Sequence, residues 1–235
     1  MDNIEKIKKL KEEKNAIILA HYYVDEEVQK IADYIGDSFY LAKVASQTEA
    51  DRIVFAGVEF MGESAKILNP NKKVLMPDAF ADCPMAHMIT IKEIKEMREK
   101  YDDLAVVCYI NSTAEIKQYA DVCVTSSNAI KIVKALPQKN IFFIPDQNLG
   151  DFVRRQVPEK NVMTNYGHCP RHTNITLDKL NEVKQKYPEA KIAVHPECKR
   201  EIVEAADFVG STSAIIDYVV RTEAKDFIIG TVDGV

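Results

Sequence analysis

The 235-residue sequence has little of what makes a chain flexible or lets it cross a membrane. It holds only eight glycines and nine prolines and no low-complexity segment, which argues against disorder and long linkers. It has no run of about 18 apolar residues, so we expect neither a membrane-spanning helix nor a membrane partner. The start, MDNIEKIKKLKEEKN, lacks a long apolar core, and a secretory signal is not expected.

An excess of positive charge is also absent. With 31 basic and 36 acidic residues the net charge is −5, which gives no electrostatic reason to expect nucleic acid as a partner. Five cysteines are an odd number for a disulfide framework, and they favour a reducing, cytoplasmic location with thiols that bind metal or stay buried. Neither G-x-G-x-x-G nor G-x-x-x-x-G-K-[ST] occurs, so no dinucleotide or nucleoside-triphosphate fingerprint is present.

What the sequence does contain is one pattern that occurs three times. Each copy begins with an apolar run that ends at His21, Tyr109 or His195. Counted from that residue, a polar residue follows at position +2 and an aspartate, preceded by alanine, at position +12. A serine or threonine follows at position +17. These equivalent residues are Tyr23, Asn111 and Glu197; Asp33, Asp121 and Asp207; and Ser38, Ser126 and Thr212. The period exceeds that of the common solenoids, so we expect three small lobes instead of a stacked array.

Short apolar runs alternate with segments of helical periodicity along the whole chain, which is typical of βα units and parallel sheets. The expected strands cover residues 17–21, 34–35, 52–57, 73–76, 105–109, 122–125, 140–144, 161–164, 191–195, 207–210 and 226–230. Asp25 is expected to cap the first helix after a strand. We predict an α/β fold of three pseudo-symmetric, three-layer αβα lobes with short parallel sheets: residues 1–86, 87–172 and 173–235, the third incomplete.

Ligands of open parallel sheets bind beyond the carboxyl ends of the strands. The residues that fall there are His21, Tyr23, Tyr109, Asn111, His195 and Glu197. Hydroxyl-containing turns at 36–38, 125–127 and 210–212 each precede an expected helix, whose free N–H groups favour anions. The pattern therefore predicts a pocket for a ligand with two or three negative groups. The alternative is that the hydroxyls only cap helices and that each histidine is a hydrogen-bonded structural residue.

Two Cys-Pro pairs extend the repeat. Cys83 lies 62 residues after His21, and Cys169 lies 60 residues after Tyr109. A third equivalent falls beyond Val235. Three thiolates on a [4Fe–4S] cluster leave one iron open for substrate, whereas two unrelated thiols are the simpler alternative. Cys108 and Cys123 have no equivalents and are expected in strand cores. Cys198 is left unassigned, and the three repeated aspartates are expected to be turn residues.

At this point the sequence resembles the quinolinate synthase family, iron–sulfur enzymes of NAD biosynthesis. The matching stretches run in the family's order from about residue 17 to residue 231: AHYY, IGDS, GVEFMGESAKIL, PDAFADCPMA, YINS, VTSSNA, PDQNLG, GHCPRH, VHPEC, GSTS and IIGT. The family's third cluster cysteine lies in a C-terminal stretch similar to C-P-N-M-K, which this sequence does not contain.

The resemblance implies three lobes around a central cavity with a [4Fe–4S] cluster at its floor. It implies condensation of iminoaspartate with dihydroxyacetone phosphate to quinolinate, phosphate and water, with an aspartate-oxidising enzyme as a source of iminoaspartate. Carried over by motif, the cluster ligands are Cys83 and Cys169. The residues that line the substrate cavity are His21, Tyr23, Ser38, Tyr109, Asn111, Ser126, His172, His195, Glu197, Ser211 and Thr212.

In this chemistry the open iron acts as a Lewis acid, and Glu197 moves protons together with Tyr23, Tyr109 and His21. The histidines, His172 among them, bind carboxylate or phosphate. Two other functions stay open: an anion-binding module without a cluster, and a zinc or iron hydrolase on the same scaffold. Iron and sulfide content after anaerobic reconstitution distinguishes the cluster-dependent condensing enzyme from these two alternatives.

Overall fold

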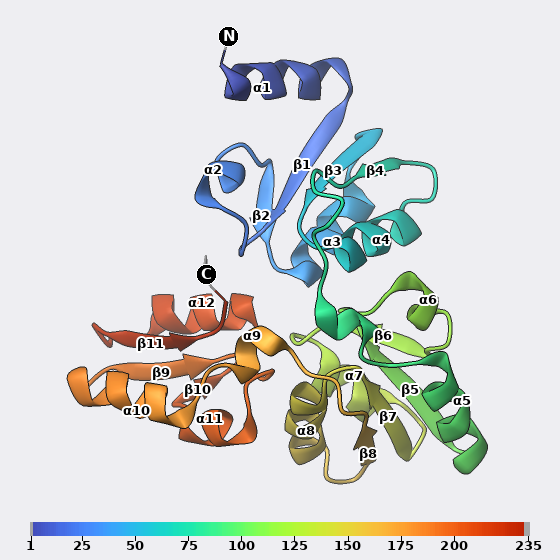
Figure 1. Ribbon diagram of the computed structural model, residues 1–235, viewed down its shortest axis with the longest axis vertical. Coiled ribbons are helices and arrows are strands. Elements are labelled where there is room, and N and C mark those ends of the chain that lie inside the picture. The colour runs from blue at the N-terminus through green and yellow to red at the C-terminus, as the bar shows by residue number, and fades with distance from the viewer. Residues whose placement is uncertain (1, 233–235) are drawn as a thin grey trace. The chain divides into compact units, whose positions relative to one another are not determined.

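The computed structural model describes residues 2–232. The predicted end of the third lobe, residues 233–235, lies outside them. The chain divides into two compact units, one up to Cys83 and one of Pro84–Val232, which are described separately. Three short parallel sheets of four, four and three strands, flanked by helices, confirm the predicted α/β class (Figure 1). The lobe boundaries 1–86, 87–172 and 173–235 stay a proposal.

The first unit contains one four-stranded sheet of order β2-β1-β3-β4. Its strands are β1 (Ala16–His21), β2 (Tyr34–Gly36), β3 (Arg52–Ala56) and β4 (Lys73–Leu75). Its helices are α1 (Asn3–Glu13), α2 (Glu26–Gln29), α3 (Ser38–Gln47) and α4 (Glu59–Leu68). The apolar run of β1 is central and its last four residues are buried, as a parallel strand covered on both faces requires.

The second sheet, in the second unit, has the order β6-β5-β7-β8. Its strands are β5 (Leu104–Tyr109), β6 (Val122–Val124), β7 (Asn140–Ile144) and β8 (Asn161–Thr164). The helical segments around it are η1 (Pro84–His87), α5 (Ile91–Lys100), α6 (Ala114–Lys117), α7 (Ala129–Ala135) and α8 (Gln147–Gln156). All six residues of β5 are buried, and its Val106 and Cys108 pack against Ile94 of α5 and Ile116 of α6.

The third sheet belongs to the same unit and has the order β10-β9-β11. Its strands are β9 (Lys191–Val194), β10 (Phe208–Val209) and β11 (Phe227–Gly230). The helices around it are α9 (Pro170–Thr173), α10 (Leu177–Lys186), α11 (Arg200–Ala205) and α12 (Thr212–Arg221). Leu180 of α10 and Ile202 of α11 pack on β9, and Tyr218 of α12 stacks on Phe208. Helix α10 is an element that the strand pattern did not predict.

The three repeated aspartates make the same contact in each sheet. Each aspartate N–H donates to a carbonyl of the central strand, and its carboxylate accepts the N–H of that same strand residue, at 2.7–2.9 Å. We call this double contact the aspartate clamp; its pairs are Asp33 with Ile18, Asp121 with Val106, and Asp207 with Ile192. The expectation that these aspartates are turn residues is confirmed, and the clamp gives the reason for their repetition.

Several helix starts differ from expectation. Asp25 precedes α2 but makes no side-chain capping bond. Asp37, not Ser38, caps α3 by accepting from Tyr40 N at 2.8 Å, and α7 starts only after Asn128. Only the third hydroxyl turn caps its helix, where Ser211 accepts from the Ala214 N–H. In α3 the aspartate one residue before the serine takes the capping role, whereas Asn128 makes no side-chain capping bond.

One cysteine also lies differently from expectation. Cys108 is fully buried in the core of β5, as predicted, but Cys123 is exposed. The reason is the strand order, which makes β6 an edge strand with one open side. No helix in the described part of the chain has the length and apolar character needed to cross a membrane.

Candidate functional site

The second unit gathers a buried polar network where β5 and β9 end. Tyr109 is the last residue of β5, and Glu197 follows β9 by three residues. The Tyr109 phenol donates to Glu197 Oε1 at 2.5 Å, although 88 residues separate the two in the sequence. Glu197 is 3% exposed and Tyr109 5%. The carboxylate of Glu197, which follows a strand of the third sheet, is therefore kept out of water and paired with a phenol of the second sheet. The pair lies beyond the carboxyl ends of the strands, where ligands of parallel sheets bind.

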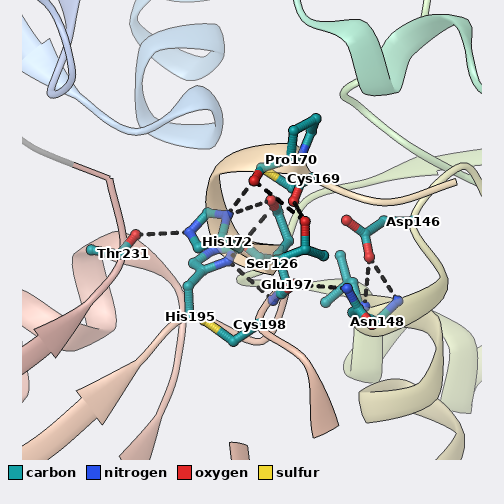
Figure 2. A network of polar contacts seen from close by, with 12 residues as sticks. Ser126, Asp146, Asn148, Cys169, Pro170, His172, His195, Glu197, Cys198 and Thr231 are labelled. Carbon is teal, nitrogen blue, oxygen red and sulfur yellow. Dashed lines mark hydrogen bonds and ion pairs between the residues drawn. The ribbon is translucent and has the colours of Figure 1, made fainter. Parts of the chain in front are cut away.

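His172 contacts the other oxygen of the Glu197 carboxylate. Its Nδ1 lies 2.9 Å from Glu197 Oε2 and 3.1 Å from the sulfur of Cys169, and its Nε2 lies 3.1 Å from the hydroxyl of Thr231 (Figure 2). The Cys-Pro pair explains the position of the ring, because Pro170 is the first residue of the short helix α9 that carries His172. Imidazole, thiol and carboxylate thus converge at one point.

His195 completes the network from the end of β9. Its ring stacks on that of His172, with centroids 4.7 Å apart and planes 24° apart (Figure 2). Its Nδ1 accepts the backbone N–H of Glu197 at 3.3 Å, so a neutral ring carries its proton on Nε2. That Nε2 lies 3.1 Å from the hydroxyl of Ser126, the residue two positions after β6.

The electrostatics of the network centre on Glu197. Burial alone raises the pKa of this carboxyl, but the charges of His172 and His195 and the hydrogen bonds from His172 and Tyr109 hold its pKa well below its usual range. Burial and the adjacent Glu197 raise the pKa of the Tyr109 phenol. The same two causes raise the pKa of the Cys169 thiol. The arrangement therefore places an ionised carboxylate beside groups that keep their protons.

The sequence analysis missed three residues of this network: Asp146, Asn148 and Thr231. Asp146 is fully buried at the start of α8, where its Oδ1 accepts the N–H groups of Asn148 and Leu149 at 2.8 and 2.9 Å. Its Oδ2 has no hydrogen-bond partner among residues 2–232. Asn148 donates to the carbonyl of Glu197 at 3.0 Å (Figure 2). Burial and Glu197 raise the pKa of Asp146. The stretch PDQNLG carried this signal, but its residues fall outside the offsets of the repeat.

The first unit holds the equivalent turn after β1. The backbone N–H of Tyr23 donates to Nδ1 of His21 at 3.4 Å, which repeats the contact between Glu197 and His195. His21 is buried, and its ring lies 4.0 Å from that of Tyr23. The Tyr23 phenol accepts from the N–H of Val58, and burial raises its pKa. His21 and Tyr23 are thus brought together within this unit.

The remaining predicted residues are placed as follows. Asn111 has a buried Oδ1 with no hydrogen-bond partner in the part of the chain that the structure describes. Ser211 and Thr212 are buried at the start of α12, and Ser211 is its cap. Ser38 and Cys83 are half-buried in the first unit. Of the predicted residues, those joined in the network of the second unit are Tyr109, Ser126, Cys169, His172, His195 and Glu197.

The donor atoms also fit a metal centre. One ligand atom each from Cys169, His172 and Glu197 lies within 4.8 Å of the others, and all three residues are buried. Burial and Glu197 raise the pKa of the Cys169 thiol, so a thiolate at this position would be stabilised by a bound cation. Thiolate is the ligand that iron–sulfur clusters require. The Cys169 thiolate is therefore suited to bind iron, and imidazole and carboxylate groups surround it.

Three related parallel sheets, with acid–base groups buried beyond the ends of their strands, define a multi-lobed α/β enzyme. The sequence model of the quinolinate synthetase A protein family matches residues 5–235. The chain belongs to that family, as the sequence resemblance indicated.

Curated relatives agree over nearly the whole chain. A quinolinate synthase of Fusobacterium nucleatum is 60% identical over 231 residues, which cover 98% of this chain and 77% of that protein. One of a Sulfurihydrogenibium species is 55% identical, covering 99% of this chain and 75% of the relative. One of Aquifex aeolicus is 54% identical, covering 97% and 70% respectively. These relatives are longer than the present sequence.

Proposed function

We propose that this chain is a quinolinate synthase of NAD biosynthesis, which condenses iminoaspartate with dihydroxyacetone phosphate and releases phosphate and water. Relatives at 54–60% identity that carry this name support the activity. The observation on which the proposal depends most is the buried network of Tyr109, Glu197 and His172. The condensation forms an imine and eliminates water, and both steps require protons to be moved within a site that excludes solvent.

We propose that Glu197 and its partners act as one proton-carrying group. A carboxylate whose pKa is held so low is a weak base by itself, because its oxygens are occupied by donors. When Tyr109 gives its proton to substrate, or rotates its hydroxyl toward substrate, Oε1 of Glu197 becomes free to accept a proton. His172 can pass a proton between Oε2 and the hydroxyl of Thr231, since its two nitrogens contact these two groups. Tyr109, Glu197, His172 and Thr231 therefore form one continuous chain of polar contacts.

The anionic parts of the substrates need donors, and the same network supplies them. In its neutral form His195 carries the proton on Nε2, at the contact with Ser126, and a substrate carboxylate or phosphate can replace that hydroxyl. The free Oδ1 of Asn111 provides an acceptor for a substrate hydroxyl or imine N–H. We propose that His21, Tyr23, Ser38, Ser211 and Thr212 complete substrate binding, and that His21 and Tyr23 take part in catalysis.

We propose a [4Fe–4S] cluster as the cofactor, with Cys83 and Cys169 as ligands. When bound, the cluster supplies a Lewis acid for a substrate carboxylate or nitrogen. We further propose that an aspartate-oxidising enzyme delivers the iminoaspartate. A reducing, cytoplasmic location suits this chemistry, and none of the five cysteines, which all lie within the described residues, is in a disulfide.

The decisive test compares Glu197→Gln with Glu201→Gln, which alters an exposed glutamate of α11. Both variants are reconstituted anaerobically with iron and sulfide, and quinolinate formation is measured by chromatography. We expect Glu197→Gln to lose about a hundredfold in kcat with unchanged iron content, because the amide cannot accept a proton. Glu201→Gln should keep full activity. Retained turnover in Glu197→Gln excludes this residue as proton carrier, and no quinolinate from the unmodified protein overturns the proposed function.

A further inference from the structure

Two cysteines that the proposed reaction does not use lie opposite each other on adjacent strands. Strand β5 pairs with β6 in parallel, and the register sets Cys108 against Cys123. Residues in register on parallel strands project from the same face of a sheet, and neighbouring strands are about 4.8 Å apart. A disulfide needs Cα atoms about 4.4–6.8 Å apart, and the spacing of neighbouring strands falls within that range.

The two thiols differ in exposure in the way that a reactive dithiol requires. Cys123 is exposed on the edge strand, whereas Cys108 is fully buried behind it. The neighbouring Cys108 thiol lowers the pKa of Cys123 to about 7, with Lys117 as a further cause. Cys108 is the partner that keeps its proton, because the contact with Cys123 and burial both raise its pKa. The accessible sulfur is therefore the nucleophile, and the buried sulfur can resolve the bond that it forms.

We propose that Cys108 and Cys123 form an oxidisable dithiol that closes to an intrachain disulfide on reaction with low-molecular-weight disulfides. The Cys123 thiolate attacks one sulfur of the reagent RSSR, which breaks the S–S bond and releases one RS⁻. Cys108 then loses its proton and attacks the Cys123 sulfur of the mixed disulfide, releasing the second RS⁻. Two protein thiols are oxidised, one RSSR is reduced to two RSH, and the two protons of the dithiol end on these products.

This dithiol is separate from the proposed cluster ligands. Cys83 and Cys169 are each followed by proline and are repeat equivalents, whereas Cys108 and Cys123 belong to one copy only. The position is nevertheless close to the site in the chain, because Tyr109 directly follows Cys108 and Ser126 lies three residues after Cys123. A disulfide here joins the two strands whose ends carry Tyr109 and Ser126.

The test treats the reduced full chain with oxidised glutathione at neutral pH, followed by acid quenching, alkylation of free thiols and digestion with trypsin. Cleavage after lysine places Cys108 in peptide 101–117 and Cys123 in peptide 118–131, so the disulfide appears as one species joining them. We expect that linked species in the unmodified chain, reversible by dithiothreitol. Cys123→Ser, a surface change, should abolish it. Cys108→Ser should leave glutathione attached to Cys123, because no resolving thiol is present.

A rate measurement supplies a second criterion. In Cys108→Ala we expect alkylation of Cys123 by iodoacetamide at neutral pH to slow about fivefold, because a smaller fraction of the thiol is ionised. Glutathione that stays on Cys123 of the unmodified chain, or a Cys123 linked mainly to Cys83 or Cys169, overturns the proposal. So does an unmodified chain in which both peptides 101–117 and 118–131 remain fully alkylated after oxidation.

Discussion

The phenol of Tyr109 and the carboxylate of Glu197 meet at 2.5 Å from the strand ends of two different sheets. Neither is exposed by more than 5%. The contact couples the charge of the Glu197 carboxylate, beyond a strand of the third sheet, to the Tyr109 hydroxyl of the second sheet. A proton shared between these atoms is shielded from water, so the geometry of the pair controls where it resides.

Removal of this hydroxyl tests the coupling. In Tyr109→Phe we expect kcat for quinolinate formation to fall about tenfold to a hundredfold, because Glu197 loses a donor and the site loses an acid. Initial rates on reconstituted protein check this, with Tyr101→Phe at the end of α5 as a matched control. A Tyr109→Phe enzyme as fast as the control shows that the phenol only positions Glu197.

The strand ends that carry Tyr109, His195 and Glu197 were predictable from sequence because the repeat marks them at fixed offsets. Asp146 was not, since it follows β7, a strand whose equivalents in the other copies carry no similar residue. The exposure of Cys123 depends on strand order, which makes β6 an edge, and local composition does not encode that order. The cap of α3 was missed for a third reason: Asp37 competes with Ser38 for the same N–H groups.

The cysteine assignment leads to a second prediction. Cys169→Ser should strongly lower the iron and sulfide bound after anaerobic reconstitution, because serine does not replace a thiolate ligand. Cys198→Ser is the matched control, since Cys198 is also buried and its thiol donates to the carbonyl of Gly230. Iron per chain, measured by colorimetry, should be unchanged in the control. Equal iron in both variants contradicts the role of Cys169.

The aspartate clamp predicts a pH-dependent stability. In the folded chain the N–H of Ile192 and the Lys191 ammonium hold the pKa of Asp207 below its ordinary value of 3.8. A lowered folded pKa gives stability that is present above 3.8 and is lost as the pH falls through the folded pKa. Asp207→Ala should therefore cost about 1 kcal/mol at neutral pH, and the difference should shrink in acid.

Urea unfolding of both proteins at several pH values measures that difference. Asp217→Ala, which removes an exposed carboxylate of α12, serves as the control and should change the free energy of unfolding little at any pH. A constant difference for Asp207→Ala across the acid range shows that the clamp acts through packing and not through charge.

The contact between Ser126 and His195 gives a fourth prediction. In Ser126→Ala the imidazole loses the hydroxyl 3.1 Å from its Nε2, so its orientation toward an anionic substrate group is less fixed. We expect KM to rise about fivefold, equivalent to about 1 kcal/mol, with a smaller change in kcat. Ser127→Ala, whose hydroxyl contacts Thr125, is the control. A change confined to kcat assigns Ser126 to the chemical step instead.

Each aspartate clamp fixes the main chain three residues before a strand-end side chain: His21, Tyr109 or His195. The clamp uses only backbone groups of the strand, so it does not depend on which side chain the strand-end residue carries. A single substitution of the strand-end residue can therefore change its chemistry while the clamp stays intact. At this position the three copies carry two imidazoles and one phenol.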